Sequence, residues 1–277
     1  MSVSAATRYR LDDLRRLGAS LASGLGVSPP RASALASQLL WFDSAGLSEH
    51  GIATLPGWLD RIVRKEVDPA AEGRPRLEHA GTAVVEGRNG LAPLVLAKAA
   101  GIAAEKARDV GLGIVRVTGL GPTGPAAPVA ADLAVGPFLA AIVGPGPSWT
   151  VAVPTAEGLP ILHDSRLGPP EAGGEVPAWL DAWPLWAGAV SGGEEGWAIL
   201  ALNLPALEPL VGFRERVAAM APPAPRGVGS LSPPAWEASR REALDRGVPL
   251  DDRGSAGLRA WADRLGVAWP SETEPTP

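Results

Sequence analysis

The sequence predicts an α/β protein in which helical segments at both ends of the chain flank a central domain of strands and helices. Two observations lead to this prediction. Apolar residues recur at spacings of three and four in the first 62 residues and again after residue 203, as amphipathic helices require. Between about residues 81 and 203, short apolar runs bounded by glycine or proline alternate with helical stretches, which is typical of strands in an α/β domain.

The N-terminal segment predicts three helices. They cover residues 11–25, 28–45 and, starting near residue 51, a stretch up to residue 62. Ser28 is a hydroxyl N-cap followed by two prolines that suit a first helical turn, and Gly46 ends the second helix. His50 follows this end directly. If the chain is helical again near Gly51, Thr54 lies one turn from His50 on a shared side.

The rest of the chain predicts strands first and helices afterwards. The expected strands are Thr82–Glu86, Ile114–Thr118, Leu139–Val143, Thr150–Val153, Leu159–His163 and Gly196–Asn203. The expected helices are Pro93–Val110, Leu207–Met220, Ala235–Arg246 and Ala256–Leu265. We therefore expect residues 1–80 and 204–270 to form one helical region, residues 81–203 to form the α/β domain, and residues 271–277 to be a disordered tail.

Composition excludes several classes of function. The 25 Lys plus Arg and 30 Asp plus Glu give a net charge of −5, which argues against nucleic acid and anionic membranes as partners. Cysteine is absent, and the three histidines, His50, His79 and His163, lie on separate elements, so we expect no metal site. Met1–Arg10 has no apolar core, and the most apolar later run, Ala126–Val143, is broken by Asp132 and Pro137. We therefore expect a cytoplasmic protein.

Five segments, in order, carry a resemblance to a known family. They are Gly46–Pro56, Glu86–Leu91, Glu105–Val117, Trp197–Asn203 and Glu237–Leu250. Together they resemble the malate/L-lactate dehydrogenase family of NAD(P)-dependent oxidoreductases, which differs from the Rossmann-fold dehydrogenases. The similarity extends over most of residues 9 to 266. It implies a central mixed, largely antiparallel sheet, helical segments that pack together for dimerisation and on the substrate side, a homodimer, and NAD or NADP as cofactor.

The resemblance also implies a catalytic role for His50. Reduction of a 2-oxo acid or a cyclic imino acid needs a proton donor, and histidine suits that role because its pKa lies near working pH. Relatives carry Asp-Ser-His-Gly followed by an arginine that clamps the substrate carboxylate, where this chain has Ser48-Glu49-His50-Gly51 and Thr54. Threonine supplies no charge, and the Glu49 carboxylate would raise the pKa of His50 and repel an anion. We therefore expect Glu49 and Thr54 to contact a neutral or cationic substrate.

Two further places correspond to site residues of the relatives. Their substrate-facing aspartate falls on Asp164 or on His163, and we expect Asp164 to assist His50 in catalysis. Their second polar signature falls on the turn that contains Gly121, Thr123 and Gly124, which are the candidate cofactor-binding residues. Prolines 122, 125 and 128 make a regular helix with free N-terminal amides unfavourable here, so the glycine pattern predicts a turn.

Two functional hypotheses follow. In the first, the chain is a divergent oxidoreductase that acts with NAD(P)H on a small 2-oxo, 2-hydroxy or cyclic imino compound. In the second, the nucleotide site has been lost, which leaves a cofactor-free proton-transfer enzyme, such as an isomerase or lyase, or a non-catalytic binding protein. The second rests on a chain shorter than typical relatives, with only Gly144–Trp149 in place of nicotinamide loops and no Gly-Gly-x-Lys-Gly motif between Ser165 and Gly196.

Overall fold

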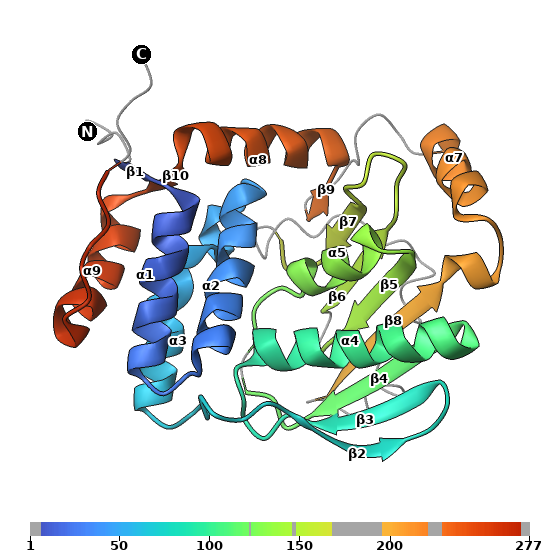
Figure 1. Ribbon diagram of the computed structural model, residues 1–277, viewed down its shortest axis with the longest axis horizontal. Coiled ribbons are helices and arrows are strands. Elements are labelled where there is room, and N and C mark those ends of the chain that lie inside the picture. Colours follow the sequence, from blue (N-terminus) through green and yellow to red (C-terminus); the bar gives the residue numbers. More distant parts are fainter. Residues whose placement is uncertain (1–6, 122, 146–147, 168–195, 221–228, 273–277) are drawn as a thin grey trace. The chain divides into compact units, whose positions relative to one another are not determined.

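The computed structural model describes residues 7–121, 123–145, 148–167, 196–220 and 229–272 (Figure 1). The chain divides into two compact units, which are considered separately: unit 1 comprises Met1–Ala70 and Pro234–Pro277, and unit 2 comprises Ala71–Pro233. The predicted α/β class is confirmed. Most of the predicted tail, from residue 273 onward, lies outside the described residues.

Unit 1 is mainly helical. Its helices are α1 (Leu11–Gly24), α2 (Pro29–Ser44), α3 (Leu55–Val63), α8 (Pro233–Arg246) and α9 (Asp252–Leu265). Two short 3-10 turns, η1 (Ser48–His50) and η2 (Ile52–Thr54), connect α2 to α3, and β1 (Thr7–Tyr9) pairs antiparallel with β10 (Val248–Leu250). The three predicted N-terminal helices are confirmed, and the 3-10 turns form the segment around His50.

Helix α9 packs closely against the segment that follows His50. A Cβ added to Gly254 would lie 2.9 Å from the Cβ of Ala53, and one added to Gly257 would lie 3.2 Å from Cγ of Pro56. The helix begins earlier than the sequence pattern predicts because the Asp251 side chain accepts a hydrogen bond of 2.7 Å from the Gly254 N–H and so caps an additional turn. Small residues in this turn of α9 thus let it support η2 and the start of α3.

Unit 2 is built on an eight-stranded sheet in the order β2-β3-β4-β8-β5-β6-β7-β9. The strands are β2 (Arg74–Glu78), β3 (Thr82–Glu86), β4 (Leu112–Thr118), β5 (Phe138–Val143), β6 (Trp149–Val153), β7 (Ile161–Asp164), β8 (Trp197–Asn203) and β9 (Ser230–Leu231). Among the described strands, β3 and β4 form the one parallel pair. The expectation of a mixed, largely antiparallel sheet is therefore confirmed.

Helices α4 (Ala92–Val110) and α5 (Ala127–Val135) cover one face of this sheet, α4 over β4 and β8 and α5 over β5 and β6 (Figure 1). After β8 the chain forms the short turn η4 (Leu204–Ala206) and then α7 (Leu210–Met220). Among the described residues, no helix combines the length and the hydropathy that a membrane crossing needs.

Several elements of unit 2 differ from the sequence prediction; β2 and β9 were not predicted, and α7 begins at Leu210 instead of Leu207. Helix α5 was not predicted, because the prolines near it suggested a turn only; Pro128 is tolerated because it lies in the first helical turn, where its missing N–H has no intrahelical partner to lose. Strand β7 begins at Ile161 instead of Leu159, since Leu159 belongs to a turn in which its carbonyl accepts a hydrogen bond of 2.6 Å from the Thr155 hydroxyl. The shift makes Asp164 the last residue of the strand.

Candidate functional site

His50 is the last residue of η1, the short turn that follows α2. Its side chain is 24% exposed, and its ring centroid lies 5.6 Å from that of Phe42 at an interplanar angle of 55°. The imidazole therefore packs on one side against an aromatic ring and remains reachable on another. This placement fits a group that exchanges a proton with a bound molecule, and it differs from both a closed apolar core and an open surface.

Asp43, near the end of α2, fixes the backbone that follows His50. Its side chain is almost completely buried, and Oδ2 accepts a hydrogen bond of 2.7 Å from the N–H of Ile52. A Cβ placed on Gly51 would lie only 2.1 Å from Oδ1 of Asp43. Position 51 must therefore be glycine for the carboxylate to reach the backbone, and the carboxylate in turn fixes where η1 ends and η2 begins.

Burial of Asp43 has an electrostatic cost. Desolvation is the largest effect and raises the pKa of this carboxyl to about 6, against the opposing influence of the Ile52 N–H and the Ser48 hydroxyl. The Oδ1 atom is buried and accepts no hydrogen bond of good geometry from any described residue. A partly satisfied acid beneath the histidine loop is costly for stability, which points to a role in shaping this loop.

The two residues expected to contact substrate lie on either side of His50. The Glu49 side chain is 60% exposed, and its Oε1 lies 4.0 Å from Nε2 of His50. The Thr54 hydroxyl donates a hydrogen bond of 2.8 Å to the carbonyl of Gly51, so its hydrogen is already used within the turn. The polar groups around the imidazole in unit 1 thus provide negative charge and acceptors, which suit a neutral or cationic molecule better than a carboxylate.

Asp164 lies in unit 2, at the end of β7, and is 1% exposed. Its Oδ2 accepts a hydrogen bond of 2.8 Å from the Thr150 hydroxyl, and its Oδ1 accepts one of 2.9 Å from the N–H of Arg166. Burial raises the pKa of this carboxyl, while these donors and the backbone N–H groups of Ala126 and Ala127 lower it. The carboxylate therefore holds the start of α5, a placement that favours a structural role over a catalytic one.

Arg166 ties the candidate cofactor loop to this cluster. Its Nη1 donates to the carbonyl and hydroxyl oxygens of Thr123, both at 3.0 Å, and to the carbonyl of Gly124 at 3.2 Å. The guanidinium also lies over the ring of Trp197, 5.7 Å from its centroid. Because Arg166 occupies the loop oxygens and Asp164 occupies the first amides of α5, the described part of this loop does not fit a nucleotide phosphate.

His163 precedes Asp164 on β7 and points to the opposite face of the sheet. Its Nδ1 lies 2.8 Å from the Ser230 hydroxyl, and its ring stacks on Trp149 with centroids 4.4 Å apart. Burial lowers the pKa of this imidazole, and the Asp164 charge opposes that effect. His163 and Asp164, the two alternatives for the substrate-facing position, therefore lie in different surroundings, and neither can take the place of the other.

The structure thus brings together two groups of the predicted residues. Glu49, His50 and Thr54 share consecutive turns of unit 1, whereas Asp164, Thr123 and Gly124 are joined through Arg166 in unit 2; the half-exposed Gly121 lies in the same loop. Among the described residues, no group of histidines and carboxylates could hold a metal ion.

Sequence analysis missed two residues of these clusters. Asp43 follows Ala36 by seven positions and Leu39 by four, so it lies on the buried stripe of α2, where a lone carboxylate is a signal that could have been noticed. Arg166 carried no such signal, because all its partners come from distant parts of the chain.

Solved structures of other proteins share the fold of this chain. The malate dehydrogenase of Pyrococcus horikoshii OT3 superimposes with a TM-score of 0.81 at 19% identity, covering 95% of this chain and 97% of that one. The δ1-piperideine-2-carboxylate reductase of Pseudomonas syringae pv. tomato superimposes with a TM-score of 0.74 at 18% identity, covering 92% and 99%. The protein therefore has the fold of the malate/lactate dehydrogenase-like enzymes.

Sequence comparison assigns the family. The family model described as malate/L-lactate dehydrogenase matches residues 9–164, so the chain belongs to that family. A malate dehydrogenase from Pyrococcus horikoshii is 32% identical over 91 residues, which cover 33% of this chain and 25% of that protein. This matched segment spans only a quarter of the relative, so its activity comes to this chain as a proposal.

Proposed function

We propose that this protein is an oxidoreductase that reduces the C=O or C=N group of a small 2-oxo or cyclic imino compound, or oxidises the corresponding 2-hydroxy compound. The observation that supports it best is the placement of His50, a partly exposed imidazole on a turn whose backbone is held by Asp43, within a chain of the malate/L-lactate dehydrogenase family. Reductions of this class need both a hydride and a proton, and in this proposal His50 delivers the proton.

In this proposal His50 donates its proton to the carbonyl oxygen or the imine nitrogen as the adjacent carbon gains hydride. Its loop keeps the imidazole in place, because the Ile52 N–H and Gly51 are held against Asp43 and the ring rests on Phe42. Positioning of this kind lowers the barrier by removing the need to orient the donor at the moment of reaction. General acid catalysis of this type contributes about 10²- to 10⁴-fold to a rate.

The charges beside His50 favour a substrate that is neutral or cationic at this place. Glu49 is exposed within 4.0 Å of the imidazole, and Thr54 provides neither a charge nor a free hydroxyl hydrogen. A neutral cyclic imine becomes a cation as it takes the proton of His50, and this cation would gain from the Glu49 carboxylate, whereas a substrate carboxylate placed there would be repelled. We therefore propose that cyclic imines are better substrates than 2-oxo dicarboxylates.

The hydride would come from NADH or NADPH, the reductants expected from the family. The described part of the 119–124 loop does not fit their phosphates, so binding elsewhere on the chain is part of this proposal. We also propose, on family grounds, that the protein acts as a homodimer in the cytoplasm; light scattering would test its mass in solution.

The occupied loop also favours a second candidate function. If no nucleotide binds, the same imidazole could move a proton between two atoms of one substrate, as in an isomerase or lyase, without any redox step. A protein that only binds its ligand is the third outcome. Arg166 already binds the oxygens of this loop and Asp164 the amides at the start of α5, which supports these alternatives over a conventional nucleotide site.

Nucleotide binding separates these functions. A ligand at about one hundred times its dissociation constant stabilises a protein by about 2.7 kcal/mol, so the unfolding transition should shift clearly upward. We expect millimolar NADH or NADPH, but not adenosine alone, to produce this shift. Absence of a shift with either nucleotide would reject the oxidoreductase and favour the cofactor-free alternatives. The variant His50→Ala then distinguishes these alternatives, because an enzyme loses turnover whereas a binding protein only changes its affinity.

A further inference from the structure

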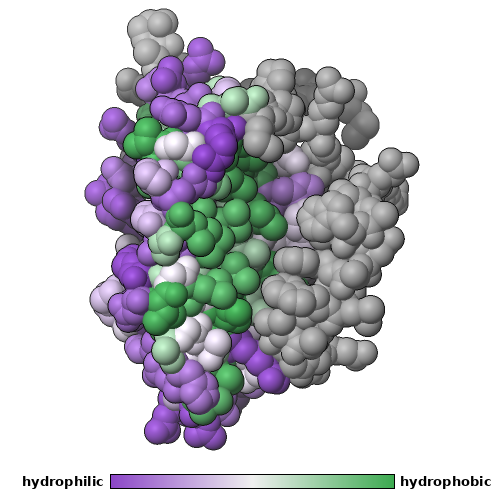
Figure 2. All heavy atoms as spheres, turned by 90° about the vertical axis from the view of Figure 1, so that its right-hand side faces the viewer, coloured by the Kyte–Doolittle hydropathy of each residue, from purple (hydrophilic) through white to green (hydrophobic). Residues whose placement is uncertain are grey.

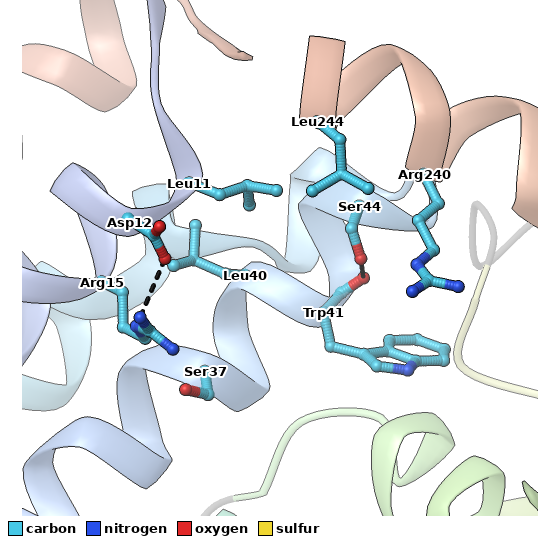
Figure 3. Close-up of a pocket in the computed structure, with 9 residues that line it drawn as sticks. All are labelled: Leu11, Asp12, Arg15, Ser37, Leu40, Trp41, Ser44, Arg240 and Leu244. Carbon is cyan, nitrogen blue, oxygen red and sulfur yellow. Dashed lines mark hydrogen bonds and ion pairs between the residues drawn. The ribbon is translucent and has the colours of Figure 1, made fainter.

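A cavity in unit 1 lies apart from the residues discussed above. It has a volume of about 320 Å³ and lies between α1, α2 and α8. Its lining consists of Leu11, Asp12, Arg15, Ser37, Leu40, Trp41, Ser44, Arg240 and Leu244 (Figure 3). This volume is at the lower end of the range that small-molecule sites occupy, which limits an occupant to a small organic molecule.

One wall of the cavity is apolar. Figure 3 shows the side chains of Leu11, Leu40 and Leu244 converging from the three helices. Leu244 is among the most exposed large apolar residues of the described chain, with 62% of its surface accessible. The indole of Trp41 adds a flat aromatic surface, held by edge contacts to Trp236 at 4.9 Å and Phe42 at 5.2 Å. An apolar group of a ligand would therefore be buried against this wall and would cover Leu244, which is now exposed to solvent.

The charges around the cavity are unbalanced in favour of a cation. Arg15 and Asp12 neutralise each other through a contact of 2.8 Å. Arg240 has a weaker partner, because Glu237 makes its short contact of 2.8 Å with Arg241 and lies 3.7 Å from Arg240. The Arg240 guanidinium extends from α8 toward the Trp41 indole, so a charged donor lies beside the aromatic surface (Figure 3).

Hydroxyl groups of α2 complete the lining. Ser44 donates to the carbonyl of Trp41 at 2.8 Å, which leaves its oxygen as an acceptor, and Ser37 is exposed at the other end of the cavity. The site thus combines the weakly paired Arg240 guanidinium with an aromatic face and three leucines. Pockets that are mostly apolar and contain a few placed polar groups bind molecules with an apolar body and one polar end.

We propose that this cavity binds a small arylalkyl carboxylate, with its carboxylate on Arg240 and its apolar body between Trp41 and the three leucines. A guanidinium recognises a carboxylate through two parallel hydrogen bonds, which explains why the polar end should be a carboxylate and not an alcohol. The proposal is independent of His50 and of the proposed reaction.

Calorimetric titration of the full chain with 3-phenylpropionate tests this site. We expect saturable binding with one ligand per chain and a loss of at least about tenfold in affinity for Arg240→Ala, since a charged hydrogen-bonded pair is removed. Arg246→Ala is the matched control, because it removes an exposed arginine of α8 that neither lines the cavity nor pairs with Glu237. Its affinity should stay within about twofold, and 3-phenylpropanol should bind at least about tenfold more weakly than the acid.

Other results would overturn the proposal. They include no binding at millimolar ligand, equal losses for both arginine variants, and loss of binding in His50→Ala, which would place the ligand at the histidine instead. If the parent protein binds no ligand and Leu244→Ala has a different oligomeric state in solution, the groove is an interface between copies of the chain. Circular dichroism of each variant establishes that the compared proteins are folded.

Discussion

Replacing Asp43 by asparagine should change how stability depends on pH. Asparagine keeps an oxygen that can accept the Ile52 N–H but removes the buried charge. The pKa of Asp43 rises from 3.8 in the unfolded chain to about 6 in the folded protein. A group whose pKa is raised by folding contributes stability that is fully present below about pH 4 and is lost as the pH rises through about 6.

The size of this loss follows from the pKa difference. A change from 3.8 to about 6 corresponds to about 3 kcal/mol, because each pKa unit is worth about 1.4 kcal/mol. We therefore expect the free energy of unfolding of Asp43→Asn, relative to the parent protein, to increase by up to about 3 kcal/mol between about pH 4 and pH 8. Urea unfolding of both proteins at matched pH values measures this difference.

A surface variant provides the control for this experiment. Asp60→Asn removes an exposed carboxylate of α3 and is measured over the same pH range. A difference between Asp43→Asn and the parent that stays constant with pH would refute the view that burial of a charged Asp43 destabilises the histidine loop. A loss that grows as the pH rises would instead show that the carboxylate is needed in its ionised form.

Three further substitutions test the two clusters. Gly51→Ala should destabilise the protein by about 2 to 4 kcal/mol, because its Cβ would lie 2.1 Å from Asp43, whereas Gly57→Ala, with nothing within 4 Å, should be neutral or slightly stabilising in thermal unfolding. Thr150→Val should cost about 1 to 3 kcal/mol by urea unfolding, since Oδ2 of Asp164 loses its donor; an unchanged midpoint would contradict this. Arg166→Met should speed amide exchange in the loop that contains Thr123, and unchanged protection there would show that the guanidinium does not hold it.

Exposed apolar side chains on unit 2 show why the dimer stays a proposal. Val110, Leu112, Leu207 and Val211 are all exposed, and Figure 2 shows hydrophobic residues gathered on this side of the molecule. Contiguous apolar surface often marks a contact site. Measurement of the mass in solution tests whether a second copy of the chain covers this surface.

Local patterns were sufficient to predict most of the helices and strands. The leucine stripe of α1 and the prolines at the start of α2 fix their positions through periodicity and capping, which are properties of neighbouring residues. Helix α5 was missed because three prolines outweighed its alanines, although Pro128 suits a first turn. Short strands such as β9 are defined mainly by their partner, here β7, and carry little signal of their own.

The candidate site was predictable only in part, for a similar reason. His50 was recognisable because it and Gly51 are retained within a segment, Gly46–Pro56, that resembles the family, although Glu49 and Thr54 differ from the relatives' residues. The contact between Asp43 and Gly51 spans two elements and depends on a close approach that no periodic pattern records. The role of Asp164 at the start of α5 depends on how β7 and the preceding loop meet in unit 2, which the sequence does not reveal.

The rate of substrate-dependent NADH or NADPH oxidation by His50→Asn tests the central claim most directly. Asparagine keeps polarity at this position but cannot donate a proton from a group with a pKa near neutrality. If His50 is the proton donor, turnover of a cyclic imine or 2-oxo acid should fall by about 10²- to 10⁴-fold while nucleotide affinity is retained. Turnover by His50→Asn within a few fold of the parent protein would contradict the assignment.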